Sequence, residues 1–201
     1  WSILDPTIFG IAIYSKGGNA AGLAFFGFAL IIIARRYEFS LVPLLLWAGV
    51  LLLLISFIWT GHAQKAGPIA QAVLSAHLVA IAFWLGSFLP LRRMCFSPES
   101  ENLYTIAERF GTHAIFYICL LLISGLIFAY ILIGDLSLLL STVYGNVFLM
   151  KITLVSALLG LGAVNKFRLV PLMKLEPSIG AQRLRKSIQI EMVIALLILL
   201  F

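Results

Sequence analysis

Two histidines accompany membrane-length apolar segments, where imidazoles are rare. His62 lies at the end of one apolar run, and His77 lies inside the next run. A polar side chain in hydrocarbon is costly and usually marks a pathway for ions, protons or electrons. Imidazole is also a common metal ligand. Two imidazoles on neighbouring segments near one membrane face therefore predict a metal or cofactor site.

The composition excludes an ordinary soluble domain. The chain has 201 residues, of which 62% are hydrophobic and 11% are charged, whereas soluble domains carry about 25% charged residues. The net charge is +6, which by itself would fit a nucleic-acid partner. However, the basic residues lie in short connections between apolar runs, as in membrane proteins. The expected surroundings are a lipid bilayer, and nucleic acid is excluded as a partner.

Six apolar runs approach the length of about 20 residues that a helix needs to cross a bilayer. They cover residues 19–34, 40–60, 69–91, 113–134, 147–165 and 188–201. The runs are too long for barrel strands, so the predicted fold is an all-α, polytopic transmembrane helical bundle, with residues 1–201 as a single domain. Glycines inside them, such as Gly27, Gly49 and Gly162, suit close helix approach. Because the sequence starts at Trp1 and ends in an apolar run, we expect further residues at both ends and about eight helices in the intact protein.

The distribution of the basic residues predicts which connections face the cytoplasm. Eleven of the fourteen lie in the alternate connections 35–39, 92–112 and 166–187. The positive-inside rule predicts that these three connections are cytoplasmic. His62 then lies at the outer mouth, and His77 lies about 12 Å deeper at about 1.5 Å per residue. His113 begins a run on the cytoplasmic side, where an interfacial imidazole is expected.

Four further polar or aromatic residues lie inside or near the ends of the runs. Trp84 is two helical turns after His77, and either packs against a helix or lines a pathway. Lys151 either extends its ammonium to the interface, tunes the outer site or pairs with Asp135. Asn165 and Glu191 lie near the inner ends of two runs and can reach the same level. Glu191 is expected either to form a structural pair with Lys186, Lys166 or Arg168, or to act at an inner gate or proton site.

An ordered set of short motifs resembles the copper resistance protein D (CopD) family of bacterial inner-membrane proteins. The matching pieces are Gly61-His62-Ala63, His77-Leu78 with Trp84-Leu85-Gly86, Ser124-Gly125-Leu126, Tyr144-Gly145 with Lys151, Asn165-Lys166 with Pro171, and Leu184-Arg185-Lys186-Ser187 with Glu191. Lys166 stands where the family usually has arginine. The resemblance covers nearly the whole chain.

The resemblance implies a copper-handling transport protein of the inner membrane. Copper would be received at the periplasmic face, with His62 and His77 as ligands, and passed inward. Lys151 would tune the entrance, and Asn165 and Glu191 would line or gate the inner half. A periplasmic copper-binding protein is the implied partner.

Two other classes of function stay open. Two histidines can hold a b-type haem between helices, although the difference in depth counts against it. A structural or assembly subunit without transport would have inert histidines. An enzyme is not expected, because no nucleophile motif, no zinc-protease motif and no paired carboxylates are found.

Overall fold

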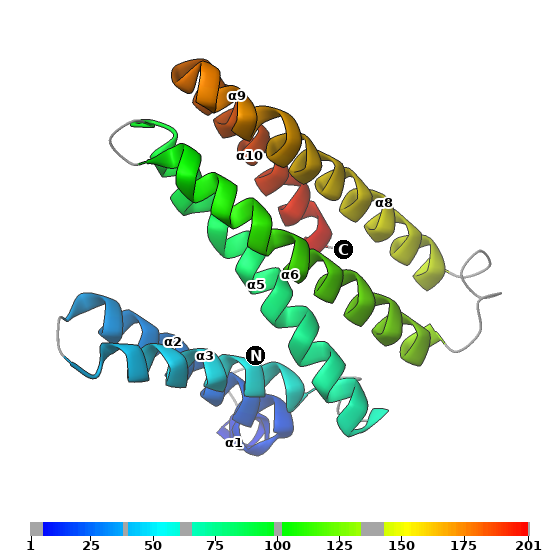
Figure 1. Cartoon of the computed structure of the whole chain (residues 1–201). Helices are drawn as coiled ribbons and strands as arrows, with labels where there is room; N and C mark the ends of the chain where they lie inside the picture. The colour runs from blue at the N-terminus through cyan, green and yellow to red at the C-terminus, as the bar shows by residue number, and fades with distance from the viewer. Residues whose placement is uncertain (1–5, 38–39, 61–65, 99–101, 134–142, 201) are drawn as a thin grey trace. The chain divides into compact units, whose positions relative to one another are not determined.

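The apolar runs fold into helices, as their length requires in a bilayer. The computed structural model describes residues 6–37, 40–60, 66–98, 102–133 and 143–200 (Figure 1). Every regular element within these residues is helical, which confirms the all-α prediction. The helices are α1 (Pro6–Tyr14), α2 (Lys16–Arg36), α3 (Val42–Ile58), α5 (Pro68–Met94), α6 (Leu103–Ile133), α8 (Val143–Val164), the π-helix η2 (Asn165–Leu169), α9 (Val170–Leu175) and α10 (Pro177–Leu200).

Four helical segments of the described chain are long and apolar enough to cross a membrane. They are α2, α5, residues 103–131 of α6, and the run from Gly145 to Leu175. The expected runs 40–60 and 188–201 correspond to α3 and to the second half of α10. At 17 residues, α3 spans about 25 Å, slightly less than the ~30 Å hydrocarbon core. The first half of α10 carries Arg183, Arg185 and Lys186, which lowers its hydropathy.

Two of the basic connections are largely helical. The connection 92–112 contains the end of α5 and the first turns of α6, and the connection 166–187 contains η2, α9 and the first half of α10. Helices therefore continue past the apolar runs. The charged side chains lie on these extensions, where the backbone stays hydrogen-bonded while the ends of long side chains reach water.

The chain divides into two compact units, residues 1–78 and 79–201, with the division inside α5. In the first unit, α2 and α3 lie side by side (Figure 1). Their closest approach is at Gly27 and Gly49: a Cβ on Gly27 would lie 2.8 Å from the Gly49 carbonyl oxygen, and the reverse distance would be 2.7 Å. The predicted use of these two glycines for close helix approach is confirmed.

The variant Gly27→Ala is expected to lower the stability of the purified protein. The added methyl group cannot fit against the Gly49 carbonyl, and overpacking of this kind costs about 1–3 kcal/mol. Gly22→Ala is the matched control, because it makes the same change on α2 where no atom lies within 4 Å of the new Cβ. Thermal unfolding in detergent compares the two variants. Equal melting temperatures would contradict the close contact.

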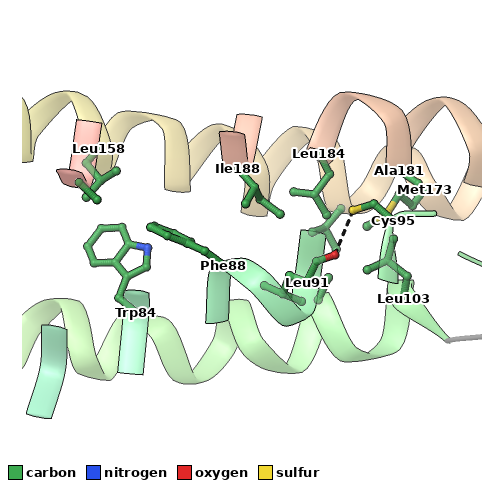
Figure 2. Close-up of a cluster of buried hydrophobic side chains, with 13 residues drawn as sticks. Trp84, Phe88, Leu91, Cys95, Leu103, Leu158, Met173, Ala181, Leu184 and Ile188 are labelled. Carbon is green, nitrogen blue, oxygen red and sulfur yellow. Dashed lines mark hydrogen bonds between the residues drawn. The ribbon is translucent and has the colours of Figure 1, made fainter. Parts of the chain in front are cut away.

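The second unit contains the larger buried cluster. Its core side chains come from α5, α6, α8, α9 and α10 (Figure 2), and include Trp84, Phe88, Leu91, Leu103, Leu158, Met173, Leu184 and Ile188. Cys95 closes one end of the cluster, where its thiol donates to the Leu91 carbonyl at 3.2 Å. These contacts bring α10 against α5 and α8, and so place the residues of the site described next.

Candidate functional site

A cavity of about 250 Å³ lies inside the second unit. Side chains from α5, α6, α8, η2, α9 and α10 form its wall. Most of the wall is apolar, with aromatic rings from Trp84, Phe88, Phe110 and Phe167. The polar side chains are those of Ser87, Asn165, Lys166 and Glu191. The cavity therefore has a localised polar region, and that region includes two of the residues that the sequence singled out.

The π-helix η2 places Asn165 and Lys166 in the cavity wall. Pro171 follows it, and proline has no N–H to donate to the carbonyl one turn earlier and crowds that carbonyl. The widened turn accommodates the proline: the Val170 N–H donates to the Asn165 carbonyl, five residues back. Single π turns inside α-helices are often found at functional sites.

Glu191 is the buried charged residue of the site. Its side chain is only 2% exposed. Oε1 accepts a hydrogen bond from Asn165 Nδ2 and one from Ser187 Oγ, the latter at 3.3 Å. The two side chains thus meet, as their levels predicted. The alternative of a pair with a lysine or arginine is wrong, because both hydrogen-bond partners found for Glu191 are neutral. Ser187 lies one helical turn before Glu191 on α10, and Asn165 contacts Glu191 from η2.

Lys166 is directed to a different partner. Its ammonium donates to the Gly111 carbonyl on α6 at 2.6 Å. Its aliphatic stem passes Gly111 so closely that a Cβ there would lie 3.4 Å from Lys166 Cγ. The lysine therefore connects η2 to α6 across the cavity wall, and its charge lies beside the cavity without pairing with Glu191.

Trp84 fits both interpretations made from the sequence. It is 7% exposed and belongs to the buried cluster. A Cβ on Gly162 of α8 would lie 3.4 Å from the edge of its indole ring. The same ring borders the cavity. Its packing role is therefore established by contact, while a role in a pathway stays a prediction.

The structure describes only some of the residues that the sequence assigns to the outer side of the membrane. His77 is half-buried on the part of α5 that belongs to the first unit. His62 falls at 61–65, outside the described residues, so the predicted pairing of the two imidazoles stays a prediction. Lys151 is half-buried on α8, and the Asp135 suggested as its partner also lies outside the described residues. His113 is exposed, with Nδ1 2.8 Å from the Arg109 carbonyl oxygen.

Metal-ligating side chains are sparse in the described part of the chain. Among those residues, no three of the His, Cys, Asp and Glu side chains gather closely enough to hold a metal ion. The oxygen atoms of Glu191, Asn165 and Ser187 suit hard cations better than soft Cu(I), which prefers sulfur and imidazole. The inner polar cluster therefore lacks the ligands that Cu(I) prefers.

The contacts of two site residues, Ser187 and Lys166, were not predicted from the sequence. Ser187 precedes Glu191 by four residues, and this helical spacing was a usable signal. Lys166 was considered as a possible partner of Glu191, but its actual partner Gly111 is 55 residues away in the sequence, and no local pattern indicates such a contact.

Comparison with known proteins finds a similarity, and it lies within the second unit. Residues 104–201 match the family model described as Copper resistance protein D. This segment contains α6, α8, η2, α9 and α10, and so most of the cavity wall. No curated protein and no solved structure matches the chain.

Proposed function

Because residues 104–201 match the family model described as Copper resistance protein D, we propose that this chain is a copper-handling membrane protein that transfers copper inward across the bacterial inner membrane. The family match is the observation that carries the proposal. The membrane-length helices and the polar cavity within the matched segment support a route for a cation.

The entrance is assigned to His62 and His77. Imidazole nitrogens bind copper well, and a permeating ion needs successive sites that are not too tight. By the positive-inside rule, both histidines belong to the periplasmic side, and the basic segments 35–39, 92–112 and 166–187 belong to the cytoplasm. Copper would arrive from a periplasmic copper-binding protein. Lys151, which the same rule assigns to the outer part of its helix, would limit how tightly the entrance holds a positive ion.

The inner half of the route is assigned to the cavity. Glu191 supplies negative charge in a mostly apolar wall, and Asn165 holds its carboxyl in place by a hydrogen bond. Trp84 forms part of the same wall. An intramembrane carboxyl group beside a cavity is typical of an ion pathway. The family match favours copper as the transported species and gives no support to haem.

Vesicles that contain the purified chain are expected to accumulate copper faster than protein-free vesicles of the same lipid. The reason is that the bilayer alone presents hydrocarbon to the ion, whereas the chain presents the histidines and the Glu191 cavity. The measurement is copper in the lumen against time, with zinc as the comparison ion. Equal rates for vesicles with and without protein would contradict the proposed function.

A further inference from the structure

Among the described residues, no cation pairs with the buried carboxyl group of Glu191. The described residues of α5, α6, α8 and α9 contribute no ionisable side chain to the cavity wall. The ionisable side chain that η2 contributes to the wall is Lys166, and its ammonium donates a hydrogen bond to the Gly111 carbonyl on α6. On α10, the neighbours Leu184 and Ile188 are buried and apolar. A buried carboxylate without a counter-ion is costly, and a carboxyl group in that situation commonly takes up a proton.

The Asn165 amide is suited to both protonation states of Glu191. As it stands, its Nδ2 donates to the carboxyl group, as a carboxylate requires. Its Oδ1 is buried and has no hydrogen-bond partner among the described residues. Leaving such an acceptor unpaired costs about 1–3 kcal/mol, so its presence needs an explanation. A half-turn of the amide would bring Oδ1 to the carboxyl group, where it would accept the O–H of the protonated acid.

The cavity gives the carboxyl group access to water. A water molecule takes about 30 Å³ of liquid volume, so a cavity of about 250 Å³ has room for several. Ser87, Lys166 and Asn165 supply polar atoms along its wall. Water in the cavity would bring a proton to Glu191 along these polar atoms.

We propose that Glu191 and Asn165 form a proton-binding site whose charge controls the passage of the cation. Cavity water delivers a proton to the carboxylate, giving the carboxylic acid and releasing the water that carried it, and the Asn165 amide turns to accept the new O–H. The anionic form attracts a cation into the cavity, and the neutral form releases it. The second half of this inference rests on the proposed function, because it requires a transported cation.

Infrared difference spectroscopy tests the proton site directly. The full chain in lipid nanodiscs is expected to show a carboxylic-acid C=O band that appears as the pH falls and is absent in Glu191→Gln. Glu176→Gln is the matched control, since that carboxyl group is exposed and its loss should leave the buried band unchanged. Should Glu191→Gln fail to fold, Asn165→Ala keeps the carboxyl group and must shift the same band. A wild-type spectrum without a band assignable to Glu191 at any pH would overturn the proposal.

A second measurement tests the coupling. Copper accumulation is measured in vesicles with an imposed pH gradient and the membrane potential clamped. Exchange of one proton for one copper predicts about a tenfold change in the accumulation ratio per pH unit, and no such dependence in Glu191→Gln. If copper accumulation by the wild-type chain does not change with the pH gradient, the proposed coupling is overturned. A complete lack of copper uptake would instead contradict the proposed function, and the infrared result would still decide the proton site.

Discussion

The double variant His62→Ala with His77→Ala is expected to lose most of the copper that the purified chain binds. Both imidazoles are assigned to the periplasmic entrance, and alanine offers no nitrogen in their place. His77 is half-buried in a segment that must lie in hydrocarbon, where a polar side chain needs a functional reason. The measurement is copper per protein by metal analysis after gel filtration.

Two comparisons show whether the loss of copper is specific to His62 and His77: the two single variants, and a variant of the third histidine. If the two imidazoles share one ion, each single variant loses most of the copper, whereas separate sites lose about half each. His113→Ala is the matched control, because its ring is exposed and lies beside the Arg109 carbonyl on α6. Unaltered copper content in the double variant would reject the histidine assignment.

The variant Asn165→Ala is expected to slow copper transfer by tenfold or more while leaving copper binding at the entrance unchanged. It removes the Nδ2 donor from the buried Glu191 carboxyl group, so that of the two donors found among the described residues Ser187 alone remains. An unpaired buried polar group costs about 1–3 kcal/mol, and about 1.4 kcal/mol corresponds to a factor of ten. Transfer is measured by copper accumulation in vesicles, and binding by metal analysis of the same preparation.

Asn146→Ala provides the matched control for this variant. It makes the same substitution on α8, at an exposed position, and is expected to transfer copper at the wild-type rate. Circular dichroism of both variants checks that the helices are retained. A normal transfer rate in a folded Asn165→Ala protein would remove Asn165 and its hydrogen bond from the inner half of the route.

The helices and the meeting of Asn165 with Glu191 could be predicted because they depend on local patterns. Apolar length decides which segments become membrane helices. Two polar residues near the same end of neighbouring helices share one depth, and a polar side chain at that depth seeks a partner. The contact of Gly27 with Gly49 follows in the same way, since small residues permit close approach in lipid.

The cavity and its lysine could not be predicted because they depend on packing between distant segments. The Lys166 ammonium lies on the Gly111 carbonyl only because η2 reaches α6. The first turns of α6 and α10 carry charged residues. Hydropathy alone therefore predicted that these helices begin later in the sequence than they do. Pro171 does not fit inside a regular α-helical turn, but the widened π turn that accommodates it is a property of the folded chain.

Metal analysis and an optical spectrum on one purified sample of the unmodified chain test the central claim most directly. The claim is that the chain takes up copper through imidazole ligands. It predicts bound copper and a spectrum without a Soret band. A Soret band, or protein that retains no copper after incubation with the ion, would contradict it.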